Sequence, residues 1–143
     1  MAIPEAESGS TEVDIRNRVL RRPYQRNQGT GEIMKTTKKP KIPYTYIFLR
    51  KDMKMVYYPI QAAHAAQEAG IKFGAHKSGL PIHFALFEVK NELELFKTSK
   101  YLEKHGIEFV MFHEPDDDTG YTAIATKPYT DKKDLMKGFN FFR

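Results

Sequence analysis

The fold of this chain is decided by the stretch RKDMKMVYYPIQAAHAA, residues 50–66. It joins a short apolar run to an alanine-rich segment through a bend that is crowded with charge. A strand that stops and turns into a packed helix gathers polar side chains and helix N-terminal amides at one edge of a sheet, where open α/β folds bind ligands. This stretch therefore predicts both an α/β fold and the position of a site.

The chain on either side of this stretch predicts alternating strands and helices. Residues 44–49 are apolar at nearly every position, which is typical of a strand covered on both faces. Residues 59–70 predict a helix, because Pro59 suits a first turn and the alanines allow close packing on a sheet. Residues 83–89 predict a second strand, and Asn91 and Glu94 form a capping-box pattern for a helix that ends near residue 104.

The last third of the chain predicts a hairpin and a terminal hook. Residues 108–112 and 121–126 have strand character, and the acidic connection between them is too short for a crossover helix. Thr130 is expected to cap a short helix that ends at Lys137, and the phenylalanines at 139, 141 and 142 are expected to pack into the core. The predicted fold class is α/β, with a mixed sheet of about four strands sandwiched by helices.

Composition limits the kind of protein. With 143 residues, of which 41% are hydrophobic, the chain has enough apolar surface for one ordinary domain. The absence of cysteine excludes disulfides and thiolate chemistry. No apolar run is long enough to span a bilayer, and the first residues lack the apolar core of a secretion signal. We therefore expect a cytoplasmic protein with no membrane partner.

The net charge of +5 belongs to the front of the chain. Residues 1–41 hold nine Lys and Arg against five Asp and Glu, whereas residues 42–143 hold fourteen against thirteen. This polar, basic composition predicts a disordered N-terminal extension, residues 1–41, before one domain, residues 42–143. Such a tail either grips phosphate backbones or is only solvated, and the second interpretation is favoured. Met34 begins a run typical of a translation start, so residues 1–33 are either a natural extension or a misplaced start.

Several short motifs occur in an order that resembles one family. Arg50-x-Asp52-x-Lys54-Met55 is followed by Gln61-x-x-His64-Ala65, by a helix near Asn91-Glu92-Leu93, by an acidic residue after the third strand, and by Thr122-Ala123-Ile124-Ala125. In this order, residues 44–142 resemble the type-II peptidyl-tRNA hydrolases. The resemblance implies that family's mixed sheet between helices, and peptidyl-tRNA as the substrate, cleaved at the ester that joins the peptide to the terminal ribose.

The same resemblance implies the residues of a site. The catalytic candidates are Lys54, His64, Glu114, Asp116 and Thr122, and the substrate-binding candidates are Arg50, Lys51, Asp52, Tyr57, Gln61 and Thr119. The family's aspartate after the third strand corresponds best to Glu114, with Asp116 as the second candidate. A catalytic lysine of the family is missing, because the turn that carries it is two residues shorter here and reads Val56-Tyr57-Tyr58-Pro59. We hypothesise that Lys54 replaces it.

Ester hydrolysis explains why such residues would be needed. It requires a positioned water, a group that takes the water's proton, and donors for the developing oxyanion. Glu114 or Asp116 is suited to the first two tasks. Lys54, Thr122 and the first amides of the 59–70 helix are suited to the third.

Each of these residues also has a purely structural interpretation. His64 on an alanine-rich helix is as consistent with packing as with catalysis, and Arg50, Asp52 and Lys54 alternate like an ion-paired surface row. The aspartates at 116–118 lack the glycine and glutamate of an EF-hand, so a solvated turn is favoured, and we expect no metal and no other cofactor. The alternative function is a weakened scaffold that binds tRNA, or a protein through an exposed Tyr57-Tyr58 edge; a homodimer also stays open.

Overall fold

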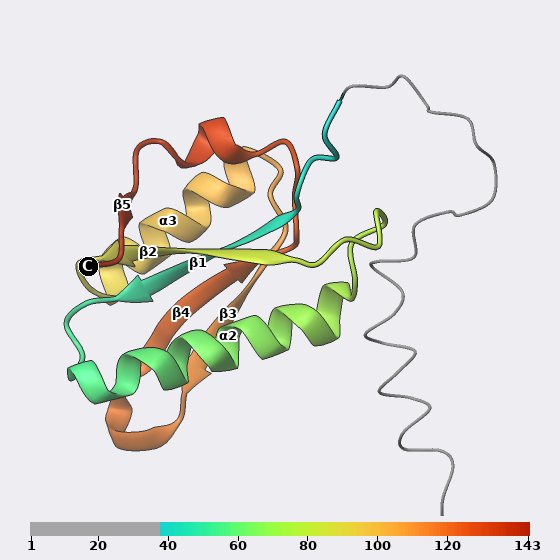
Figure 1. Cartoon of the computed structure of the whole chain (residues 1–143). Coiled ribbons are helices and arrows are strands. Elements are labelled where there is room, and N and C mark those ends of the chain that lie inside the picture. Colours follow the sequence, from blue (N-terminus) through green and yellow to red (C-terminus); the bar gives the residue numbers. More distant parts are fainter. Residues whose placement is uncertain (1–37) are drawn as a thin grey trace, which may run out of the picture. The chain divides into compact units, whose positions relative to one another are not determined.

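One mixed sheet organises residues 38–143, the part of the chain that this computed structural model describes (Figure 1). Its five strands have the order β3-β4-β1-β2-β5. The strands are β1 (Tyr44–Arg50), β2 (His83–Val89), β3 (Phe109–Glu114), β4 (Gly120–Thr126) and β5 (Asn140–Phe141). The helices are α2 (Tyr58–Phe73) and α3 (Glu92–Lys104), with 3-10 turns η2 (Met55–Tyr57), η3 (Asp116–Asp118) and η4 (Lys133–Met136). The predicted α/β class is confirmed, and the sheet has one strand more than expected.

Strand directions follow from the connections. β1 and β2 are parallel and are joined through α2, whereas β3 and β4 form the predicted antiparallel hairpin. β4 is also antiparallel to β1, so β3 runs in the same direction as β1 and β2. The carboxyl ends of β1, β2 and β3 therefore lie at one rim of the sheet, together with the amino end of β4.

Alternate residues of β1 divide the core between two layers. Tyr46 and Phe48 pack with buried residues of α3 and η4, whereas Ile47 and Leu49 pack with Ala65 and other small residues of α2. All the residues from Thr45 to Leu49 are buried, as expected of a strand with both faces covered. Figure 1 shows α2 and α3 on opposite sides of the sheet.

Local sequence signals explain where the two helices begin and end. Pro59 lies in the first turn of α2, which continues three residues beyond the predicted end and stops at Gly74 in the left-handed region, with φ of 68°. Asn91 caps α3 by accepting a 3.0 Å hydrogen bond from the Glu94 amide. In a full capping box the Glu94 carboxylate would accept from the Asn91 amide. Here it pairs with Lys97 at 3.0 Å instead.

The end of the chain departs from prediction. The expected short helix before Lys137 forms only as the 3-10 turn η4, and the predicted Thr130 cap is wrong, because Lys132 precedes η4 without a side-chain cap. Phe139 packs edge-on against Phe48 with ring centroids 4.8 Å apart, as the hook prediction requires. Phe141, however, forms part of β5 and stays 64% exposed while it stacks on Phe87. The hook thus becomes the fifth strand.

Two sequence expectations concern regions beyond the sheet. No helix within residues 38–143 is long and apolar enough to cross a membrane. The basic extension predicted over residues 1–41, together with Met34, falls almost wholly outside the described residues.

Candidate active site at the sheet rim

The rim collects the segments that the sequence marked as a site. β1 ends at Arg50, β3 ends at Glu114 and β4 begins at Gly120, all at the same edge. The chain leaves β1, forms η2 and enters α2 at this edge, and the η3 turn closes the hairpin beside it (Figure 1). The 50–54 bend, the start of α2 and the 114–122 hairpin, which carry the predicted site residues, therefore converge in the fold.

The Arg50 guanidinium ties the bend to the hairpin. Its Nε and Nη2 donate to the two carboxylate oxygens of Asp52 at 2.9 and 3.0 Å. Its Nη1 donates to the carbonyl of Thr119 at 2.6 Å and to that of Tyr121 at 3.1 Å. The Arg50 side chain is only 13% exposed, so these bonds satisfy most of a largely buried cation. We call this set the Arg50 clamp.

Two residues that sequence reasoning did not place in the site complete the clamp. Glu92, in the first turn of α3, accepts the Tyr121 amide at 2.7 Å and lies 3.7 Å from Nη1 of Arg50. Gly120 has φ of 78°, and a Cβ atom there would collide with the Glu92 carboxylate. Glycine meets both the backbone conformation and the close approach without strain, whereas a larger residue has to displace the Glu92 carboxylate. Two sequence features could have identified these residues: an acidic residue at the start of the helix after β2, and a glycine at the end of an aspartate-rich turn.

A second set of hydrogen bonds runs from the core to the surface of the rim. The Thr122 hydroxyl donates to Oε1 of Gln61 at 2.6 Å, and Nε2 of Gln61 donates to Oε2 of Glu114 at 2.7 Å. Thr122 is fully buried and Gln61 is 4% exposed, whereas Glu114 is half-buried. The Asp116 amide donates to the other oxygen of Glu114 at 3.3 Å. This Thr122–Gln61–Glu114 relay holds a carboxylate in a fixed position between α2 and the hairpin turn.

Hydrogen bonding keeps the rim carboxylates ionised. The amide of Gln61 is the main cause that lowers the pKa of Glu114, the Asp116 amide adds to it, and the charges of His64 and His113 act in the same direction. The Arg50 hydrogen bonds likewise lower the pKa of Asp52. Glu114 is therefore an anion at neutral pH.

The fold constrains the side chains of the other predicted catalytic residues less than it constrains Glu114. Lys54 is exposed at the start of η2, and it takes part in none of the ion pairs formed within residues 38–143. His64 is exposed, and its ring lies parallel to Phe112 with centroids 4.5 Å apart. The Asp116 side chain is exposed, and its backbone does the bonding, since its carbonyl also accepts the Thr119 hydroxyl at 2.8 Å. Of the two candidate carboxylates, Glu114 is the one that the fold positions.

Thr122 cannot have the predicted role of oxyanion donor in this conformation. Its hydroxyl is fully buried and its proton is committed to Gln61. The reason is its place in β4, where its side chain points between the sheet and α2 and not toward solvent. Thr122 and Gln61 are positioning residues for Glu114.

The predicted substrate-binding residues divide in the same way. Lys51 pairs with Glu88 of the neighbouring strand at 2.9 Å, and Tyr57, on η2, is 45% exposed. Tyr58 is half-buried: its hydroxyl donates to the Lys51 carbonyl at 2.5 Å and its ring packs against Phe142. The prediction that the tyrosines form an exposed edge is thus confirmed for Tyr57 and wrong for Tyr58. The prediction of an ion-paired row is confirmed for Arg50 and Asp52.

Comparisons with known proteins bear on the fold alone. No protein-family model matches the chain, and no curated protein is significantly similar to it. Among solved structures, a protein of unknown function from Agrobacterium tumefaciens strain C58 has a similar fold, with a TM-score of 0.51 and 13% sequence identity. The match covers 71% of this chain and 98% of that one. It agrees with the α/β architecture described above.

Proposed function

We propose that this protein hydrolyses an acyl ester at the sheet rim, and that the ester is peptidyl-tRNA or a related aminoacyl-tRNA. The observation that carries the proposal is the Thr122–Gln61–Glu114 relay. It holds an ionised carboxylate, with two donors fixing its orientation, at the edge where α2 begins. The choice of a tRNA ester rests on the resemblance of the 50–65 and 114–125 motifs to type-II peptidyl-tRNA hydrolases.

The proposed reaction is a base-assisted attack of water on the ester. Glu114 accepts a proton from the water as its oxygen bonds to the carbonyl carbon, and that proton then passes to the ribose oxygen as the carbon–oxygen bond breaks. Lys54 is our candidate for holding the oxyanion, because at the start of α2 the Tyr58 amide already donates to the Met55 carbonyl and Pro59 has no N–H. Because the pKa of Glu114 is lowered, it is a weak base, and we expect slow turnover.

A second function is favoured by the surroundings of Lys54. Its neighbours Met55 and Val56 are 79% and 68% exposed, and Tyr57 and Ile60 add 45% and 49%. An apolar patch of this kind beside a polar rim is typical of a binding surface. The alternative is therefore a module on the same scaffold that binds tRNA or another protein and does not cleave the ester.

One assay separates the two functions. The full chain is incubated with labelled N-acetyl-phenylalanyl-tRNA, and released label is measured in steady state for the native protein and Glu114→Gln. The hydrolase proposal expects kcat to fall by roughly 10²–10⁴-fold in the variant. Glu108→Gln is the matched control, because Glu108 precedes the same strand at its opposite end and pairs with Lys127 at 3.0 Å.

Binding measurements complete the comparison. If filter binding shows tight association with the same tRNA while the native protein releases no label, the module replaces the hydrolase. If Glu114→Gln turns over like the native protein, the relay has no catalytic role and the proposal is wrong. Lys54→Ala tests the replacement hypothesis directly, since near-native turnover would exclude Lys54 as the oxyanion donor.

A further inference from the structure

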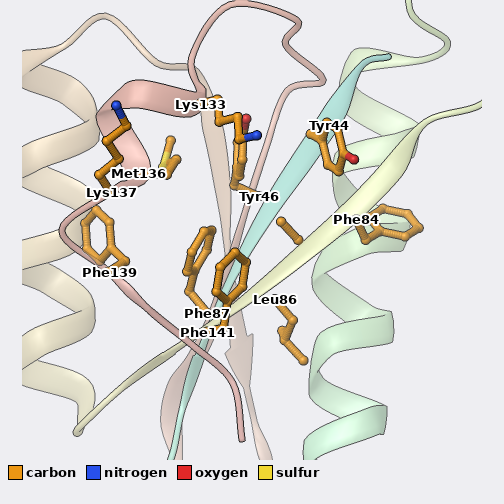
Figure 2. A pocket seen from close by; sticks show the side chains of 11 residues that line it. Tyr44, Tyr46, Phe84, Leu86, Phe87, Lys133, Met136, Lys137, Phe139 and Phe141 are labelled. Atoms are coloured by element: carbon orange, nitrogen blue, oxygen red, sulfur yellow. The ribbon is translucent and has the colours of Figure 1, made fainter.

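An apolar cavity lies at the amino ends of β1 and β2, and side chains from both faces of β2 line it: Phe87 belongs to the α3 layer and Leu86 to the α2 layer. Its volume is about 590 Å³, which is within the range of small-molecule sites. Its lining comprises Tyr44, Tyr46, Phe84, Ala85, Leu86, Phe87, Lys133, Met136, Lys137, Phe139 and Phe141. Figure 2 shows side chains of β1, β2, η4 and the terminal segment around this space. Nothing in the proposed rim chemistry uses these residues.

The floor and walls of this cavity are mainly aromatic. Tyr46, Phe87 and Met136 are 4%, 3% and 3% exposed and form a fixed apolar base. Phe141 stacks on Phe87 with centroids 4.9 Å apart, yet it keeps 64% of its surface exposed. Phe84 is 59% exposed. It lies on the part of β2 that β5 leaves uncovered, because β5 pairs only with residues 87 and 88. Flat apolar surfaces are thus available to a ligand at both the base and the mouth.

The charged side chains of the lining are both cationic. Lys133 and Lys137 both lie on the η4 side, and the lining includes no carboxylate (Figure 2). Lys137 also pairs with Asp134 at 2.9 Å, but both side chains are at least 75% exposed, so this pair is weak. Within residues 38–143 the Tyr46 hydroxyl makes no hydrogen bond, and every fully buried polar side-chain atom there has a partner. The Tyr46 hydroxyl is therefore a free donor on a side chain that lines the cavity.

We propose that this cavity binds a small aromatic acid, with its ring between the phenylalanines and its anionic group on Lys133 and the Tyr46 hydroxyl. The aromatic lining selects a flat apolar body, and the ammonium of Lys133, which unlike Lys137 forms no ion pair within residues 38–143, favours a negative charge. Burial is the main cause that raises the pKa of Tyr46, and the charges of Tyr44 and Asp131 act in the same direction, so the hydroxyl stays protonated as a donor. A neutral ligand or an apolar protein side chain would use the phenylalanines but not the lysines.

The test uses 2-naphthoate as the probe and 2-naphthamide as its uncharged counterpart. Both are titrated into the full chain while backbone amide shifts are followed by NMR and binding heats by calorimetry. We expect saturable shifts confined to the cavity lining, with a Kd for naphthoate below about 1 mM and an amide that binds roughly tenfold more weakly. Equal affinity for the two probes would overturn the assigned ligand class, and shifts elsewhere or no saturation would overturn the site.

Three variants sharpen this result. Lys133→Gln is expected to weaken naphthoate binding several-fold and to leave the naphthamide affinity unchanged. Lys132→Gln is the matched control, because it removes the same charge from the adjacent residue, whose ammonium lies over Tyr129 and outside this lining. Ala85→Leu is expected to fill the cavity and abolish binding; if it unfolds the protein, the wild-type shift map still decides the location. Equal effects of Lys132→Gln and Lys133→Gln would refute the role given to Lys133.

Discussion

Replacing Thr122 with valine isolates the relay at its buried end. The substitution keeps the shape of the side chain and removes the hydroxyl that donates to Gln61 at 2.6 Å. Thr122 is fully buried and Gln61 is 4% exposed, so no water can take the place of the lost donor without moving the core. Oε1 of Gln61 is then left as a buried acceptor with no partner.

The expected cost follows from that unpaired oxygen. A neutral hydrogen bond contributes only about 0.5–1.5 kcal/mol, but a buried polar atom left unsatisfied costs about 1–3 kcal/mol. We therefore expect Thr122→Val to lower the free energy of unfolding by about 1–3 kcal/mol, measured by urea denaturation with far-UV circular dichroism. At about 4–8 °C per kcal/mol for a domain of this size, the Tm should fall by roughly 5–20 °C.

A double-mutant cycle gives the sharper measurement. In a Gln61→Leu background both ends of the bond are apolar, so adding Thr122→Val should cost close to nothing, and the coupling should exceed about 1 kcal/mol. Thr98→Val is the matched control, because that buried hydroxyl bonds a carbonyl of its own helix at 2.8 Å, which the helix ladder also satisfies. A Thr122→Val cost below about 0.5 kcal/mol, or no coupling to Gln61, would refute the reasoning.

Three further predictions concern the Arg50 clamp. Gly120→Ala should lower the free energy of unfolding by about 1–3 kcal/mol, because a side chain there needs a strained backbone and displaces Glu92; thermal unfolding measures it, and no change would show that Glu92 moves freely. Arg50→Met should cost about 2–4 kcal/mol, since it leaves two carbonyls and the Asp52 carboxylate without their donor and removes the ion pair with Glu92; a cost below 1 kcal/mol would make the clamp a surface pair. Arg50 lowers the pKa of Asp52 below its ordinary 3.8. The Asp52 carboxylate therefore stabilises the fold fully above pH 3.8 and loses this effect as the pH falls through the lower, folded-state pKa. The free energies of unfolding of Asp52→Asn and the native protein should converge only in strong acid.

The elements that the sequence predicted best are those with a strong local signal. The buried run at β1, the Asn91 cap of α3 and the β3–β4 hairpin all formed, because hydrophobic pattern and turn length determine them locally. The failures come from tertiary packing. Phe141 joined an edge strand because the uncovered backbone of β2 offered it hydrogen bonds, and Thr130 lost its helix because that segment is pinned to β1 through a backbone pair of Tyr44 and Tyr129.

The site was predictable in place but not in role. A bend after a central strand predicts the rim, and Gln61 and Glu114 were both named from their motifs. What no sequence pattern shows is which polar side chain is buried. Thr122 is the third residue of β4, close after the η3 turn, yet it is completely covered, and one partner of Arg50 is a backbone carbonyl 69 residues away. Such contacts depend on how the hairpin meets α2.

The two hydrogen-bond sets are joined through the turn between β3 and β4. Asp117 and Asp118 have φ of 54° and 53° there, a conformation that is costly for two successive non-glycine residues. The turn keeps this geometry because it is held on both sides, by the Asp116 amide on Glu114 and by Arg50 on the Thr119 carbonyl. Arg50 does not touch Glu114, but it controls the backbone that orients the carboxylate. If the rim is catalytic, loss of Arg50 must therefore lower kcat more than it lowers affinity for tRNA, whereas a binding surface would lose affinity alone.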